Sequence, residues 1–256
     1  MAENVLKVVH MAKPSECNAQ QELPLSLLVA QMIDLATDHA NQLGIGFLEL
    51  EPRGLGWVLS RLSVEIARWP KNGEKYELST WIETYNPHFS ERCFSVVTTN
   101  GEILGYGRTI WMIIDLKTHK SEGTAGTVMP QEMIAGLGCP IPRAMKQRPF
   151  TPSQIKEYVF QYSDLDFYRH VNTVKYISLL LNQFSLRDFD QNRLSRFDIA
   201  FAHEAKYGEL ALISSITEEA KTPTLIDSKY ASFRKNFEIK TGDHTILTSS
   251  IVLTQK

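Results

Sequence analysis

The chain changes character within residues 162–177, which read YSDLDFYRHVNTVKYI. The first half is rich in Asp and Ser and is typical of a turn, whereas apolar residues recur at helical steps from Asn172 onward. Unpaired N–H groups and the positive end of the dipole lie at such a helix start, so a carbonyl that develops negative charge would be stabilised there. Asp166, His170 and Asn172 therefore fit an acyl-transfer or dehydration site, or alternatively a helix cap beside an unrelated histidine.

The bulk composition describes an ordinary globular protein of one large or two small domains. The chain has 256 residues, of which 43% are hydrophobic and 22% charged. Its net charge of −2 gives no reason to expect a nucleic-acid partner. No apolar run approaches the roughly 18 residues of a membrane span, and residues 1–10 lack the features of a secretion signal. We therefore expect neither membrane association nor export.

The cysteines and glycines indicate no cofactor. Cys17, Cys93 and Cys139 are odd in number and far apart, which predicts neither a disulfide framework nor a metal site and favours a reducing cytoplasm. Glycines occur singly or in hairpin pairs, without a phosphate-binding pattern.

The first half of the chain predicts one long helix and an antiparallel sheet. Apolar residues at helical spacing favour a helix from about residue 26 to residue 43, after a first strand near residues 5–9. Strands of alternating polarity follow from about residue 62 to residue 115, with hairpin signals at Asn72-Gly73 and Asn100-Gly101.

The plan restarts after residues 121–150, whose Gly and Pro content is typical of a linker. A strand at residues 155–162, a helix to about residue 187 and further strands are expected. Leu59-Ser60-Arg61 recurs 135 residues later as Leu194-Ser195-Arg196, and Gly73-Glu74 matches Gly208-Glu209 at the same offset. We predict an α+β protein with two copies of a helix wrapped by an antiparallel sheet, in residues 1–120 and 151–256.

This doubled unit resembles the double hot-dog fold, and its motifs are similar to those of the acyl-ACP thioesterase family. The most specific match is Ser163–Ile177, supported by Gly56–Arg61 and by the strand that ends at Asp115. The resemblance implies that the second half is catalytic. Asp166, His170 and Glu204 match the family's Asp, His and Glu, which implies that Glu204 is the general base or positions the water, that His170 orients the thioester or water, and that Asp166 holds one tautomer of His170.

Two positions depart from the family pattern. Its Asn is Tyr168 here, which removes one carbonyl-orienting donor unless the tyrosine hydroxyl replaces it. Ala205 lies where plant members carry a cysteine, so a Cys-His mechanism is excluded at this site. We expect the backbone N–H groups near Val171 and Asn172 to receive the oxyanion.

Each assignment has a simpler alternative. Asp166 could cap the helix, and His203 competes with His170 for any role given to a histidine. Strict alternation leaves open which face of the strand Glu204 uses, because a bulge near it would turn the side chain over.

The resemblance also implies that the first half sets acyl-chain specificity by lining an apolar tunnel. Met32, Leu35, Leu43, Trp57 and Leu59 are the candidates, although each fits equally well as a core residue.

The implied function is hydrolysis of fatty acyl-ACP to free fatty acid and ACP, in a bacterial-type cytoplasm. Because ACP is acidic, basic residues are expected at the tunnel mouth, and Arg143, Lys146, Arg148 and Lys175 are the candidates. An acyl-CoA thioesterase, a hot-dog dehydratase and a non-catalytic acyl-binding module remain as alternatives. Chain-length preference and oligomeric state, a homodimer included, stay open.

Overall fold

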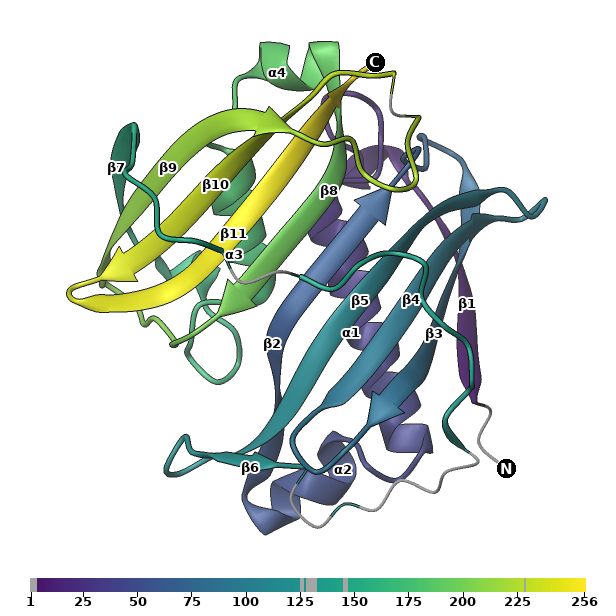
Figure 1. Cartoon of the computed structure of the whole chain (residues 1–256). Helices are drawn as coiled ribbons and strands as arrows, with labels where there is room; N and C mark the ends of the chain where they lie inside the picture. Colours follow the sequence, from purple (N-terminus) through teal and green to yellow (C-terminus); the bar gives the residue numbers. More distant parts are fainter. Residues whose placement is uncertain (1–3, 125–126, 128–132, 145–146, 228) are drawn as a thin grey trace. The chain divides into compact units, whose positions relative to one another are not determined.

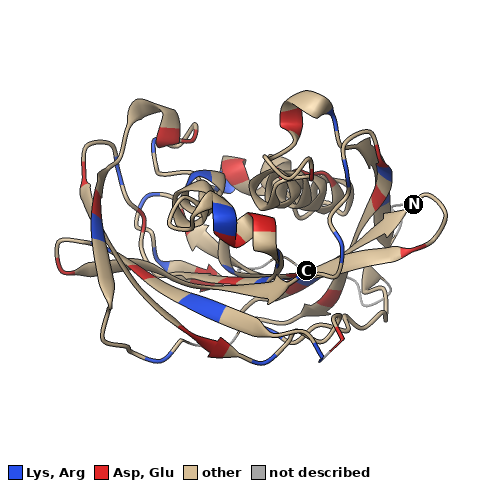
Figure 2. Cartoon of the chain, turned by 90° about the horizontal axis from the view of Figure 1, so that it is seen from above, with Lys and Arg blue, Asp and Glu red and all other residues tan. Residues whose placement is uncertain are grey.

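The computed structural model describes residues 4–124, 127, 133–144, 147–227 and 229–256 (Figure 1). The chain divides into two compact units, one made of Met1–Leu62 and Arg68–Arg143 and the other of Ser63–Ala67 and Ala144–Lys256. Figure 2 shows acidic and basic residues interspersed along both units, in keeping with a net charge of −2.

The first unit is a helix against an antiparallel sheet with the strand order β1-β3-β4-β5-β2. Helix α1 crosses one face of this sheet (Figure 1). Its elements are β1 (Val5–Met11), α1 (Leu25–Gln42), α2 (Phe47–Leu50), β2 (Leu55–Ile66), β3 (Lys75–Tyr85), β4 (Ser90–Thr98), β5 (Ile103–Asp115) and β6 (Ser121–Gly123).

Helix α1 forms where the sequence predicts it. Leu28, Met32 and Leu35 recur on one face and are buried, so packing stabilises the helix. Pro24 precedes the first turn, and Gly44 follows the last one with a φ of +70°, which glycine adopts without strain.

The second unit repeats this plan with the strand order β8-β11-β10-β9-β7. Its elements are β7 (Gln154–Val159), α3 (Thr173–Leu181), α4 (Leu186–Gln191), β8 (Asn192–Phe201), β9 (Leu210–Ala220), β10 (Ser232–Thr241) and β11 (His244–Gln255).

The single helix predicted up to residue 187 is wrong. The chain leaves α3 at Asn182 and starts α4 after Ser185. The Ser185 hydroxyl accepts a hydrogen bond from the N–H of Asp188, and the Asp188 carboxylate accepts one from the N–H of Ser185 at 2.8 Å. This capping box stabilises a new helix start at the expense of continuing α3.

The duplication is confirmed in the backbone. Gly73 and Gly208 have φ values of +81° and +79° in equivalent corners before β3 and β9. The N–H of Gly73 donates to the Ala12 carbonyl at 2.7 Å, and that of Gly208 donates to the Phe160 carbonyl at 2.9 Å. The two copies therefore share corner geometry as well as element order, and the α+β class of two tandem hot-dog units is confirmed.

Two features of the remaining chain qualify the predictions from sequence. Part of the stretch expected as a linker packs on the first unit, because Arg108 and Trp81 hydrogen-bond to the backbone of residues 137–139. Among the described residues, no helix has both the length and the apolar character needed to cross a bilayer.

The matched corners make a stability prediction. Gly73→Ala and Gly208→Ala should each lower the free energy of unfolding by about 1 to 2 kcal/mol, because a side chain is disfavoured at positive φ even though no atom lies within 4 Å of the new Cβ. Gly138→Ala, outside the left-handed region, is the control. Urea unfolding followed by circular dichroism measures all three, and equal stability of all variants would contradict the assignment.

Candidate active site

The loop before α3 is anchored by Asp164. This residue closes a 3-10 turn, Tyr162–Asp164, and only 8% of its surface is exposed. Its Oδ2 accepts hydrogen bonds from the Tyr158 hydroxyl at 2.9 Å and from the N–H of Gln161 at 2.8 Å. Its carbonyl accepts the N–H of Asn172 at 2.8 Å, which joins the start of the loop to the start of the helix.

Asp166 shapes the next part of the loop. Its Oδ1 accepts the N–H groups of Tyr168 at 2.9 Å and His170 at 3.1 Å, and its own N–H donates to the His170 carbonyl at 2.8 Å. Arg169 has a φ of +66°, so the chain reverses within a few residues. The carboxylate thus fixes the backbone on which the His170 side chain is mounted.

The loop is joined to the corner between β8 and β9. The N–H of Val171 donates to the Ala205 carbonyl at 2.9 Å, and His170 forms a bridge with Lys206. His170 Nε2 consequently lies 3.3 Å from Glu204 Oε2, with side-chain exposures of 22% and 39%. A histidine and a carboxylate thus meet where a small molecule can reach both.

The sequence predicts Glu204 on a strand, and this prediction is wrong. Strand β8 ends at Phe201, and Glu204 lies after it, in the corner between β8 and β9. The side-chain direction of Glu204 therefore does not depend on the alternation of residues along a strand. The hydrogen bonds of the corner, and not the pleat of the strand, decide where this carboxylate points.

The predicted oxyanion donors are wrong in detail. The N–H groups of Val171 and Asn172 already donate to the carbonyls of Ala205 and Asp164, so they are unavailable. Asn172 caps α3 by accepting the N–H of Val174 at 2.8 Å, which also excludes Asp166 as the cap. Thr173 is the first residue of α3, and among the described residues its N–H has no hydrogen-bond partner.

Tyr168 and His203 are each close in sequence to one member of the pair. Tyr168 is on the loop with its ring 4.2 Å from that of Phe167, and its role as a donor stays a prediction. His203 uses Nδ1 for a 2.8 Å contact with the Thr245 carbonyl, and its ring is tilted against that of His244 with the centroids 5.4 Å apart. The geometry therefore favours His170 over His203 as the histidine that works with Glu204.

Tyr176 is a residue of the site region that had no predicted role. It is buried under the loop, with its ring 5.6 Å from Phe160 and 6.0 Å from Phe201. Burial raises the pKa of Tyr176 above its usual value, and the nearby carboxylates of Glu204 and Asp166 add to the effect. Its position on the buried face of the helical pattern was the only available signal.

The first unit contains a second copy of the loop. Asn18 Oδ1 accepts the N–H groups of Gln20 and Glu22, both at 3.0 Å, and the N–H of Asn18 donates to the Glu22 carbonyl at 2.9 Å. Gln21 has a φ of +60°, like Arg169 in the second unit. The N–H of Leu23 then donates to Pro70 at 2.9 Å, as Val171 does to Ala205.

This first loop lacks the chemistry of the second. Glu22 stands where the second unit has His170, and Trp69, just before Pro70, stands where it has Glu204. The backbone device is duplicated but the His–Glu pair is not. The two loops therefore share their backbone hydrogen bonds and differ in the side chains at the positions of His170 and Glu204.

The candidate tunnel residues all lie in the first unit. Met32 and Leu35 are buried on α1, and a Cβ on Gly107 would come within 2.9 Å of the Met32 methyl group. Leu59 is half-buried on β2. Trp57 donates from Nε1 to the Ile45 carbonyl at 2.7 Å. Trp57 also packs on an apolar cluster that consists of Ala40, Leu43, Ile45 and Ile82. Their role in binding a chain stays a prediction.

The basic candidates have different surroundings. Arg143 binds the buried Glu91 with Nε at 2.9 Å and Nη2 at 2.5 Å, so its charge is already paired. Arg148 and Lys175 are exposed, whereas Lys146 lies outside the described residues. Over the described ranges, no group of three or more His, Cys, Asp or Glu side chains could hold a metal ion.

Two repeated units, each a helix wrapped by an antiparallel sheet, define a tandem hot-dog protein. The N-terminal acyl-ACP thioesterase domain model matches residues 8–133 and the C-terminal domain model matches residues 147–251. The chain belongs to the acyl-ACP thioesterase family.

Known relatives agree with this membership. A chloroplastic palmitoyl-acyl carrier protein thioesterase of Gossypium hirsutum is 26% identical over 223 residues, or 82% of this chain and 54% of the relative. A dodecanoyl-ACP hydrolase of Cinnamomum camphora is 26% identical over 185 residues, which cover 67% of this chain and 48% of the relative. The chain therefore spans about half the length of these curated relatives.

Solved structures agree in fold. The crystal structure of an acyl-ACP thioesterase from Bacteroides thetaiotaomicron superposes with a TM-score of 0.83 at 25% identity, covering 98% of each chain. The 12:0-ACP thioesterase from Umbellularia californica gives 0.78 at 20% identity, covering 100% of this chain and 96% of the other.

The two copies of the loop make a prediction about Asp166. Asp166→Asn should leave the free energy of unfolding within about 0.5 kcal/mol of the parent, because Asn18 holds the first loop with an amide oxygen. Asp166→Ala should cost about 1 to 2 kcal/mol, because two backbone N–H groups lose their acceptor. Urea unfolding gives both values. A large loss in Asp166→Asn would show that the negative charge, not the acceptor, holds the loop.

Proposed function

We propose that the protein hydrolyses the thioester of fatty acyl-ACP to free fatty acid and ACP. The observation that carries this proposal is the partly exposed His170–Glu204 pair at 3.3 Å, in which His170 lies on the loop anchored by Asp164 and Asp166 and Glu204 lies in the corner after β8. Family membership over both domains supports it. A thioester carbonyl lacks amide resonance, so an activated water suffices as the nucleophile.

In the proposed mechanism, Glu204 takes a proton from the attacking water or positions that water. His170 orients the thioester and relays the proton to the leaving thiolate. Asp166 acts on His170 through the backbone, because its carboxylate oxygen holds the N–H of that residue. The N–H of Thr173 at the start of α3 receives the oxyanion, with the Tyr168 hydroxyl as a second donor.

We also propose the carrier and the setting. An acidic ACP with a phosphopantetheine-linked chain would be attracted to exposed basic residues, of which Arg148 and Lys175 are available. The acyl chain would be bound by the first unit, where Met32, Leu35, Trp57 and Leu59 are the candidates. Cys17, Cys93 and Cys139 are free thiols, which suits a reducing cytoplasm.

The direct test is thiol release from a panel of acyl-ACPs and the matching acyl-CoAs of varied chain length. Faster release from ACP substrates supports the proposal, whereas faster release from CoA substrates would make the protein an acyl-CoA thioesterase. Hydration or dehydration of a β-hydroxyacyl substrate without thiol release would indicate a dehydratase. Chain binding without turnover would indicate an acyl-binding module, the alternative that Tyr168 favours.

Variants of the pair test the assignment of roles. His170→Asn and Glu204→Gln should each lower kcat by about 100- to 10,000-fold, because each removes a proton-transfer or orienting group. His203→Asn is the matched control and should stay near the parent rate, since its ring is bound to the Thr245 carbonyl. Steady-state kinetics on one acyl-ACP measures all three. An inactive His203→Asn with an active His170→Asn would reverse the assignment.

A further inference from the structure

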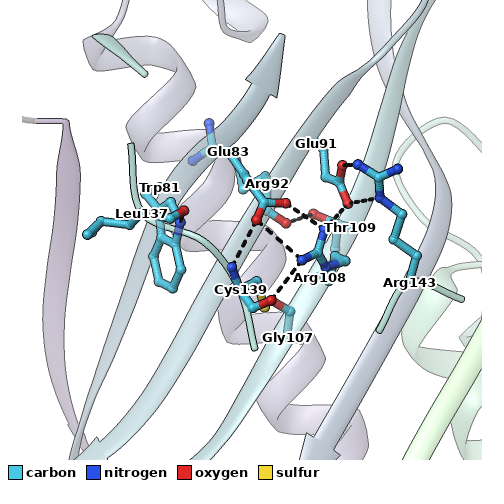
Figure 3. Close-up of polar contacts among 10 residues, drawn as sticks. All are labelled: Trp81, Glu83, Glu91, Arg92, Gly107, Arg108, Thr109, Leu137, Cys139 and Arg143. Atoms are coloured by element: carbon cyan, nitrogen blue, oxygen red, sulfur yellow. Dashed lines mark hydrogen bonds and ion pairs between the residues drawn. The ribbon is translucent and has the colours of Figure 1, made fainter. Parts of the chain in front are cut away.

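Residues 137–143, called the strap here, are bound to strands β3, β4 and β5 of the first unit. Trp81 Nε1 donates to the Leu137 carbonyl at 2.7 Å, and the N–H of Cys139 donates to Glu83 Oε1 at 2.9 Å. Arg108 Nη2 donates to the Cys139 carbonyl at 2.9 Å (Figure 3). The backbone of Cys139 is therefore held on both sides.

Buried charges complete the attachment. Arg108 binds Glu83 at 2.5 Å and also binds Glu91, which has an exposure of 0%. Arg143 of the strap supplies the second cation to Glu91 (Figure 3). Such buried pairs fix geometry tightly, because a displaced partner leaves an uncompensated charge.

This attachment brings two cysteines together. Cys93 on β4 is paired in register with Arg108 on β5, and the guanidinium of Arg108 holds the carbonyl of Cys139 at 2.9 Å. The Cys139 sulfur also lies 3.7 Å from the Gly107 carbonyl, on the same strand pair. Cys93 is buried, whereas Cys139 is partly exposed, so solvent reaches one thiol of the pair.

The surroundings make Cys139 the reactive partner. The neighbouring Cys93 thiol, the backbone at Ile141 and the charge of Arg108 lower the pKa of Cys139 to about 7 against the opposing effect of burial. The same contact and burial raise the pKa of Cys93, which stays protonated. The lowered pKa favours the thiolate of Cys139, which is the nucleophilic form.

We propose that Cys93 and Cys139 are a redox modification site, at which hydrogen peroxide converts the two thiols into an intramolecular disulfide that ties the strap to β4.

The chemistry balances with peroxide as the oxidant. The Cys139 thiolate attacks one peroxide oxygen, the O–O bond breaks, and a sulfenic acid forms with loss of hydroxide. The Cys93 sulfur then attacks the Cys139 sulfur, the S–O bond breaks, and the hydroxyl group leaves with the Cys93 proton as water. Two thiols are oxidised by two electrons, and one peroxide is reduced to two waters.

The first experiment uses the intact parent protein. After stoichiometric peroxide, the mass should fall by about 2 Da, and a non-reducing tryptic digest should contain peptide 93–108 linked to peptide 121–143. Dithiothreitol should restore both free peptides. A mass increase that corresponds to sulfinic acid on Cys139, or a disulfide between two chains, would overturn the proposal.

Single variants locate the reaction. Cys139→Ser and Cys93→Ser should each abolish the 2 Da loss, whereas Cys17→Ser, the matched control, should behave as the parent. Retention of the loss in Cys139→Ser would contradict the pairing. Circular dichroism of each variant checks the fold, and the digest of the parent keeps the test decisive even if Cys93→Ser fails to fold.

The pH dependence of alkylation tests the role of the Cys93 thiol. The rate of iodoacetamide labelling of Cys139 in the parent should rise with pH through a midpoint near 7, because the thiolate reacts. Cys17→Ser should keep this midpoint, whereas Cys93→Ala should move it upward, because the thiolate loses the neighbouring Cys93 thiol. An unchanged midpoint in Cys93→Ala would show that the two thiols do not interact.

Discussion

The candidate site depends on the hydrogen bond from the N–H of Val171 to the carbonyl of Ala205. This bond joins a loop before a helix to a corner after a strand, segments far apart in the chain. It places the residue before Val171 next to the residue before Ala205, and these two residues are His170 and Glu204. Catalytic geometry therefore follows from backbone pairing. The side chains need only occupy the positions that the pairing presents, as expected for a site mounted on a rigid scaffold.

Much of the fold could be predicted from the sequence, because helical spacing, alternating strands and hairpin glycines are local signals. The duplication was visible because Gly73 and Gly208 occupy corners that require positive φ. The duplicated loop could not be recognised from the sequence, because its two copies have different residues at this position. The amide oxygen of Asn18 and the carboxylate oxygen of Asp166 accept equivalent hydrogen bonds from the backbone. The same loop conformation can thus form with either Asn or Asp, because it requires only a side-chain oxygen that can accept the backbone hydrogen bonds.

What the sequence could not decide was set by competition among partners. The N–H groups expected as oxyanion donors bind other carbonyls: that of Val171 binds Ala205, distant in the chain, and that of Asn172 binds Asp164 in the same loop. Arg143 looked like part of a basic docking patch, yet the buried carboxylate of Glu91 binds it. The helix break at Ser185 follows from the capping box that Ser185 forms with Asp188. The bonds of Val171 and Arg143 depend on neighbours distant in the chain, which no local pattern reports, whereas the Ser185–Asp188 cap joins residues only three positions apart.

The pairing of the buried carboxylate of Glu91 with the exposed side chain of Arg143 has a consequence for the order in which the first unit is completed. Until the strap docks, Arg108 alone faces two carboxylates, those of Glu83 and Glu91, in surroundings where an unpaired charge is costly. During synthesis on the ribosome, the sheet therefore lacks one counter-ion until residue 143 has left the exit tunnel. The last residue of the first unit thereby supplies the second counter-ion of Glu91 only after all the strands of its sheet have been synthesised.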